Sequence, residues 1–162
     1  MTTGKTAIVS DIEVARAFIK AVTGILSTMA GLEAKAGMPF VKKENMPSGD
    51  ISALIGVTGP KCGTIAVSFT RSAAEVLVAG MLGDDVMDMD QDMQDAVGEV
   101  TNMVSGQARA ALAEKGMPLQ GATPSVITGQ GHCIKHMTSS PVMAIPFALG
   151  GGSTFTVEFC LE

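Results

Sequence analysis

The longest regular pattern of apolar and polar positions lies in the middle of the chain, between Asp90 and Lys115. Apolar residues recur there at intervals of three and four, which is the spacing of a helix with one buried face. Asp90 can cap the first turn, and Gly116 and Pro118 end the pattern. The sequence therefore predicts one long amphipathic helix, whose buried stripe comprises Met93, Val97, Val100, Val104, Ala108 and Ala111.

The opposite face of this predicted helix is polar and contains two glycines. Glu99 and Asn102 are three residues apart, so their side chains project side by side. A glycine inside a helix costs about 1 kcal/mol relative to alanine, so a merely solvated face gives no reason for one. We therefore expect this face to let another protein approach closely. The candidate contacts to that partner, besides Glu99 and Asn102, are Asp95, Gly98, Gly106 and Arg109.

The remaining pattern predicts a second long helix, a short helix and several strands. Ser10 and Glu13 form a capping box, and the helix that they begin extends to about Gly31. The strands fall into hairpins separated by glycine-rich turns, so the fold class is α+β with an antiparallel sheet. The predicted strands cover 40–46, 51–57, 64–70, 125–128, part of 137–149, and 154–161, and the short helix covers 72–82.

A faint internal repeat relates the two halves of the chain. Residues 21–31 (AVTGILSTMAG) align without gaps with residues 96–106 (AVGEVTNMVSG), and their apolar positions keep the same phase. In this alignment Gly24 and Ser27 occupy the places of Glu99 and Asn102. The sequence therefore predicts a pseudo-twofold arrangement of α-β-β-β repeats in which one copy carries the polar pair.

Composition and charge exclude several classes of function. The net charge is −5, with 11 Lys and Arg residues and no Trp or Tyr, which is a poor match to nucleic acid. No apolar run is long enough to cross a bilayer, and the N-terminal stretch lacks the features of a signal peptide. Three cysteines without close pairs indicate a reducing compartment. We expect a single domain over residues 1–162, located in the cytoplasm.

Three patterns suggest a bound ligand, but each lacks an essential part. Asp88–Asp92 begins like a calcium loop, yet the glycine required at the sixth position is Met93. His132, Cys133 and His136 have no second cysteine nearby to complete a zinc site. The stretch GVTGPKCG lacks the GK[ST] ending of a phosphate-binding loop. We therefore predict no metal site and no cofactor of the chain's own.

The motif GEVTNM, preceded by DAV and followed by VSG, resembles the signature of the CheX/CheC chemotaxis phosphatases. The resemblance extends over most of the chain, from the N-terminal helix through the hairpins to the closing strands. It implies a CheC-like sheet with two long helices packed on it. It also implies an enzyme that removes phosphate from the aspartate of a CheY-type response regulator. A single E-x-x-N motif is similar to the CheX-like members, which implies a homodimer.

The resemblance also implies a role for each motif residue. Asn102 would align the attacking water, and Glu99 would pair with the active-site lysine of the receiver. Magnesium would arrive bound to the receiver. The same motif recurs in related flagellar switch proteins, so a non-catalytic adaptor that binds a receiver or scaffold is the alternative. The retained Glu–Asn pair favours catalysis, because an adaptor needs neither side chain.

Overall fold

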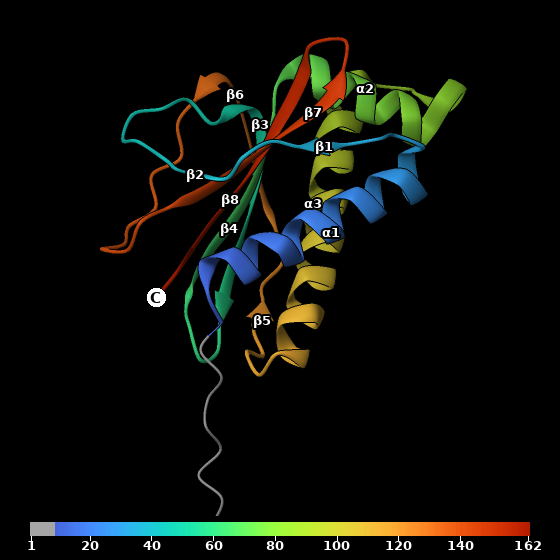
Figure 1. Cartoon of the computed structure of the whole chain (residues 1–162). Helices are drawn as coiled ribbons and strands as arrows, with labels where there is room; N and C mark the ends of the chain where they lie inside the picture. The colour runs from blue at the N-terminus through green and yellow to red at the C-terminus, as the bar shows by residue number, and fades with distance from the viewer. Residues whose placement is uncertain (1–8) are drawn as a thin grey trace, which may run out of the picture.

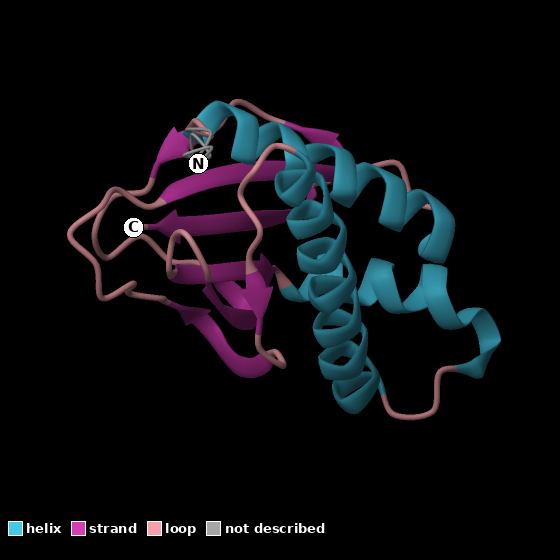
Figure 2. Cartoon of the chain, turned by 90° about the horizontal axis from the view of Figure 1, so that it is seen from below, coloured by secondary structure: helices cyan, strands magenta, loops and turns pink. Residues whose placement is uncertain are grey.

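The structure is a computed structural model that describes residues 9–162. Residues 1–8 belong to the N-terminal stretch for which no signal peptide is predicted, and they lie outside the described residues. Helices cover one face of an antiparallel sheet, and the two long helices pack against each other (Figures 1 and 2). The helices are α1 (Asp11–Ala30), α2 (Arg71–Leu82), the short 3-10 helix η1 (Gly83–Asp85) and α3 (Met89–Glu114). The strands are β1 (Lys35–Ala36), β2 (Phe40–Val41), β3 (Gly49–Thr58), β4 (Gly63–Phe69), β5 (Gln120–Gly121), β6 (Ser125–His132), β7 (Met143–Gly150) and β8 (Ser153–Leu161).

The order of the strands confirms the predicted pseudo-twofold repeat. β4 and β8 pair at the centre of the sheet, with Val67 opposite Val157. β3 pairs with β4, and β7 pairs with β8 in the same way. The short strands β1 and β2 pair with β7, whereas β5 and β6 pair with β3. Each half therefore completes the edge of the other half, and the two repeats form one continuous sheet.

The two long helices match their predicted positions, but two of the predicted caps are wrong. Ser10 and Glu13 form both bonds of the capping box at the start of α1. At the start of α3 the side chain of Asp88, not Asp90, accepts a hydrogen bond from the backbone of Gln91. For α2 the sequence offers a second capping-box pattern, Ser72 with Glu75, but the structure has Thr70 as the cap. In both corrected cases the cap lies two residues before the predicted one, since an apolar residue or an arginine also fits the first turn.

The strands near the two edges differ from the prediction. The strand expected over 40–46 is only Phe40–Val41, and β6 is twice as long as the predicted 125–128. Pro146 lies within β7 and interrupts the edge beside it. β1 pairs with residues 147–148 and β2 pairs with residues 143–144, so the break between them falls at the proline. A proline offers no N–H to a neighbouring strand, which explains why this edge is split in two.

The core lies between the helices and the sheet. Phe69, Phe147 and Phe155 stack there, with ring centroids 4.6 Å apart for Phe69–Phe155 and 4.9 Å apart for Phe147–Phe155. Both long helices bury an apolar face against the sheet and against each other. None of the helices within residues 9–162 is both long enough and apolar enough to span a lipid bilayer.

Candidate functional site

Glu99 and Asn102 lie exposed on the outer side of α3, one turn apart. The opposite side of this helix is buried against the sheet and α1, as the apolar pattern predicts. Five of the six predicted stripe residues are buried, and Ala111 is half-buried. The structure therefore presents the carboxylate and the amide to solvent on a rigid, well-packed element, which is the arrangement expected for side chains that act on a partner.

The two glycines of this helix face different surroundings. A Cβ atom at Gly106 would meet nothing within 4 Å, so this position is open to an approaching molecule. A Cβ atom at Gly98 would lie 3.3 Å from Cγ2 of Val126, a residue of β6. Gly98 therefore lets β6 pack closely beside α3, in addition to any role toward a partner.

Asp95 and Arg109, the other two candidate contacts, form hydrogen bonds within the chain. Asp95 is exposed and accepts a hydrogen bond of 2.9 Å from the side chain of Gln91. Arg109 is half-buried. Its guanidinium donates to the Ser105 hydroxyl at 3.0 Å and to the Leu119 carbonyl at 3.4 Å. The guanidinium also lies over Gly121, where a Cβ atom would come within 2.7 Å of Cζ. Arg109 thus fastens β5 to α3.

The corresponding positions of α1 have the same exposure. Gly24 and Ser27 are exposed, as are Glu99 and Asn102. The two residues between the members of each pair are buried in both helices. The burial pattern therefore supports the gapless alignment of the two helices. The two copies differ in chemistry, because glycine and serine supply neither the carboxylate nor the amide.

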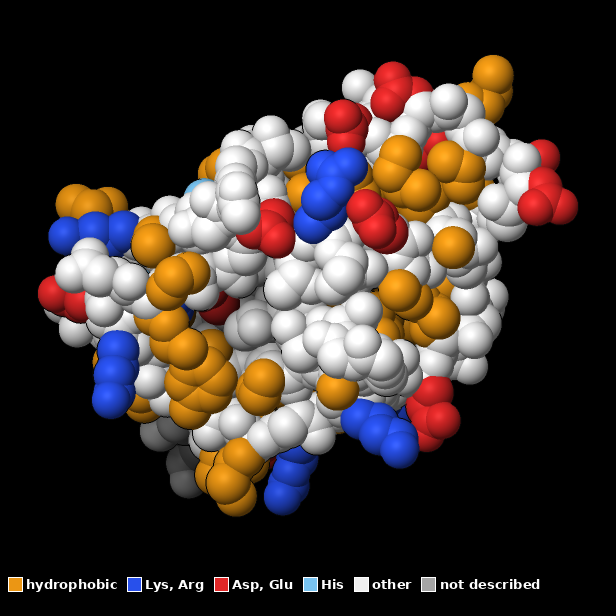
Figure 3. Space-filling model, turned by 90° about the horizontal axis from the view of Figure 1, so that it is seen from above, with side chains coloured by type: hydrophobic (Ala, Val, Ile, Leu, Met, Phe, Trp, Pro, Cys, Tyr) orange, Lys and Arg blue, Asp and Glu red, His pale blue; other side chains and the backbone are white. Residues whose placement is uncertain are grey.

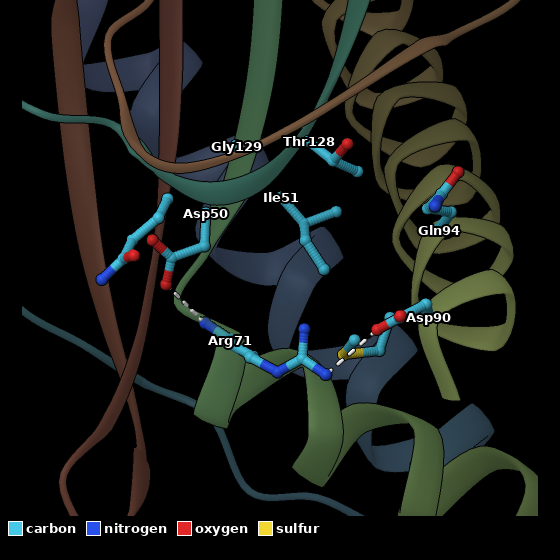
Figure 4. A pocket seen from close by; sticks show the side chains of 9 residues that line it. Asp50, Ile51, Arg71, Asp90, Gln94, Thr128 and Gly129 are labelled. Atoms are coloured by element: carbon cyan, nitrogen blue, oxygen red, sulfur yellow. Dashed lines mark hydrogen bonds and ion pairs between the residues drawn. The ribbon is translucent and has the colours of Figure 1, made fainter. Parts of the chain in front are cut away.

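A cavity of about 540 Å³, which no pattern in the sequence predicts, lies beside the N-terminal half of α3. Asp50 and Ile51 of β3, Arg71 of α2, Asp90, Met93 and Gln94 of α3, and residues 128–130 of β6 line it. Figure 4 shows Ile51 and Thr128 on the strand side of the cavity and Gln94 on the helix across from them, with Arg71 directed toward Asp90. These residues come from four separate elements, so no local motif identifies them.

The charged residues of this cavity hold one another in place. Backbone N–H groups of Gly131 and Arg71 donate to the Asp50 carboxylate and lower the pKa of that group. The Arg71 guanidinium donates to Asp90 at 3.0 Å and to Glu75 at 3.2 Å. These carboxylates, Asp90 first, raise the pKa of Arg71. Both shifts favour the charged forms of Asp50 and Arg71.

The patterns that suggested metal ions have other roles in the structure. Asp88 and Asp92 accept backbone hydrogen bonds at the start of α3. His132 contacts the Ser52 hydroxyl at 2.6 Å, and His136 contacts the Glu158 carboxylate at 3.0 Å. Across residues 9–162, no three His, Cys, Asp or Glu side chains gather closely enough to hold a metal ion.

The pseudo-twofold α+β fold places this protein in the class of CheC-like proteins, and one of its long helices carries the exposed E-x-x-N pair. The family model described as Chemotaxis phosphatase CheX matches residues 51–148, and the chain belongs to this family. A chemotaxis protein CheX from Desulfovibrio desulfuricans, known from a crystal structure, is 59% identical in sequence to this chain. The two structures superpose with a TM-score of 0.87, and the match covers 93% of this chain and 99% of that one.

Two more distant relatives resemble the whole chain. The CheY-P phosphatase CheX of Thermotoga maritima is 27% identical over 153 residues, which cover 94% of this chain and 97% of the relative. A CheX–CheY–BeF3–Mg²⁺ complex from Borrelia burgdorferi contains a chain that is 22% identical, with a TM-score of 0.75. This similarity covers 93% of this chain and 99% of that one, and it shows the common fold.

Proposed function

We propose that this protein is a phosphatase that hydrolyses the phospho-aspartate of a CheY-type response regulator. The observation that carries the proposal is the Glu99–Asn102 pair, exposed on α3 in a chain of the CheX family. The name of the Thermotoga maritima relative supports the substrate, and the Borrelia burgdorferi complex supports the partner.

The chemistry suits an amide rather than a strong base. An acyl phosphate is already reactive, so its hydrolysis depends mainly on the position of the attacking water and on charge stabilisation. The Asn102 amide has both donors and an acceptor, so it can hold a water molecule in one orientation. Because Asn102 is exposed on a rigid helix, it can enter the active site of a docked receiver.

Glu99 would fix the orientation of that docking. A carboxylate close to a phosphoryl group is repelled unless a cation lies between them, and the active-site lysine of the receiver supplies one. Magnesium bound to the receiver would neutralise charge on the phosphoryl group. This chain would then contribute two side chains and a close-fitting helix face, and it would need no cofactor of its own.

The proposal is tested by following phosphate release from the phosphorylated CheY-type receiver of the same organism. Replacing Asn102→Ala should lower kcat on the order of a hundredfold, because the amide acts mainly in the transition state. Binding to a receiver loaded with beryllium fluoride and Mg²⁺ should persist. The matched control is Gln107→Ala, which removes another exposed amide from the same helix. Near-normal turnover by Asn102→Ala would refute the catalytic role.

Variants of Glu99 separate docking from catalysis. Glu99→Ala should weaken binding of the receiver, and Glu99→Lys should weaken it more because two cations would then face each other. Equal binding by the parent and the lysine variant would contradict the pairing. A parent protein that binds the receiver without releasing phosphate would instead be the non-catalytic adaptor.

We also propose a homodimer in the cytoplasm. Membership of the CheX family supports the homodimer, and the free cysteines and the proposed partner support the cytoplasm. The dimer is tested by light scattering, in which a mass near twice the 16.6 kDa of one chain is expected. A mass of one chain at micromolar concentration would contradict it.

A further inference from the structure

The cavity lined by Asp50, Arg71, Asp90 and Gln94 adjoins the Glu99–Asn102 face. Gln94, Gly98 and Asn102 recur every four residues and therefore form one row along α3. β6 borders this row, with Val126 beside Gly98 and Thr128 at the cavity that Gln94 lines. Eight residues separate Gln94 from Asn102, which is about 12 Å along the helix. A single docked domain covers that distance easily, since one partner typically buries about 800 Å².

We infer that this cavity receives a lysine or arginine side chain of the same receiver whose phospho-aspartate Asn102 approaches. This inference rests on the proposed function and adds a second anchoring point to it. The cavity would then set which receiver docks productively, separately from the chemistry at Asn102.

The walls of the cavity are held rigidly, so an incoming side chain meets a preformed site. The Asp50 carboxylate accepts from the backbone of Arg71 and of Gly131, each at 2.8 Å, and so joins α2 to the end of β6. The His132 ring bonds to the Gly129 carbonyl at 2.8 Å and to Ser52 at 2.6 Å. A preformed site loses less entropy on binding than one that must first be ordered.

The charge of the cavity favours a cation. The Asp50 and Asp90 carboxylates and the Arg71 guanidinium line the cavity, which gives the lining a formal charge of −1. Glu75, outside the lining, also accepts from the guanidinium and brings the group to −2. Along the chain, residues 72–108 contain eight Asp and Glu and no Lys or Arg. Figure 3 shows one face of the molecule, on which acidic side chains gather toward the upper right with one basic side chain among them.

The floor of the cavity suits the aliphatic stem of such a side chain. Ile51 and Met93 line it and are 5% and 1% exposed, respectively. Asp90 stands at the rim, and its side chain is 72% exposed, so it has acceptor capacity beyond its bond to Arg71. A lysine or arginine could therefore bury its carbon chain on Ile51 and place its charged end at Asp90.

The test compares two charge reversals of equal size. Asp90→Lys should raise the KM for the phosphorylated receiver about tenfold, and should leave kcat within about twofold, because a docking charge pair is lost and no reacting group is touched. Asp84→Lys, which changes an exposed acidic residue outside the cavity lining, should alter KM less than about twofold. Gln94→Trp, which fills the cavity, should raise KM without a charge change.

The same variants are titrated with the receiver loaded with beryllium fluoride and Mg²⁺, and circular dichroism verifies that each is folded. Asp90→Asn replaces Asp90→Lys if the latter fails to fold. Equal effects of the Asp90 and Asp84 reversals, or an unchanged KM for Gln94→Trp, would overturn the inference while the parent still hydrolyses. A parent that neither binds nor hydrolyses any receiver would overturn the proposed function, and the inference with it.

Discussion

Replacing Lys42→Met should destabilise the protein strongly, although Lys42 is far from the Glu99–Asn102 pair in sequence. Its ammonium lies 2.8 Å from the Glu158 carboxylate, and the two side chains are only 7% and 1% exposed. The ammonium also donates to the Ser48 hydroxyl and to the Ile134 carbonyl. This network fastens two long loops, 42–48 and 133–142, over the sheet face opposite the helices.

The magnitude follows from the burial of both partners. Without Lys42, the carboxylate of Glu158 keeps hydrogen bonds from the Ser48 hydroxyl at 3.1 Å and from the His136 ring at 3.0 Å. Removing one member of a buried ion pair typically costs about 3–5 kcal/mol, because the other charge stays desolvated. A domain of this size has a free energy of unfolding of about 5–15 kcal/mol. The variant should therefore lose at least about a fifth of its free energy of unfolding.

The assay is urea denaturation followed by far-ultraviolet circular dichroism, with Lys43→Met as the matched control. Lys43 is the neighbouring residue and is exposed, so its loss should cost less than about 0.5 kcal/mol. Combining Lys42→Met with Glu158→Met removes both charges and should recover much of the loss. A cost below about 1 kcal/mol for Lys42→Met would refute the reasoning. So would a double variant that loses more free energy of unfolding than the two single variants lose together.

Three further predictions concern pH, the helix glycines and the first helix. Burial raises the pKa of Glu158, but hydrogen bonds from His136 and Lys42 outweigh burial and lower it overall. The stabilisation of the fold by the Glu158 carboxylate is therefore fully present above the unfolded pKa of about 4.3 and is lost as pH falls through the lower folded pKa. Acid unfolding of the parent, compared with that of Glu158→Gln, will show this loss. Gly106→Ala should raise the free energy of unfolding by about 0.5–1 kcal/mol, whereas Gly98→Ala should gain less because Val126 lies close, as thermal unfolding will measure. Ser27→Ala should leave the rate of phosphate release unchanged, and a strong loss would reveal a second active site on α1.

The sequence predicted the parts of this fold that depend on local periodicity and capping. The apolar spacing defined α3 to within one residue of each end, and the capping box defined the start of α1. The face of α3 that carries Glu99 and Asn102 followed from the same periodicity. These features depend on residues three or four apart, which the sequence displays directly.

Features that depend on contacts between distant residues could not be predicted. The length of β6 follows from its pairing with β3, and its own glycines gave a weak strand signal. Arg109 was expected to face a partner, but a carbonyl that becomes available only after β5 folds back binds it internally. The cavity at Asp50 and Arg71 joins four elements, so its residues carry no common spacing.

The pseudo-twofold fold explains why one helix can lose the polar pair without loss of the fold. Each half completes the sheet of the other, so both helices are needed to cover the sheet whatever their outer faces carry. The burial of α1 follows that of α3 position by position, yet Gly24 and Ser27 are exposed and free of packing constraints. Within residues 9–162, α2 follows β4 and no helix follows β8, so the cavity that Arg71 forms with α3 is not repeated there. The proposed docking at α3 would therefore use an element without a counterpart beside α1 in the described residues, and this asymmetry favours a single site per chain.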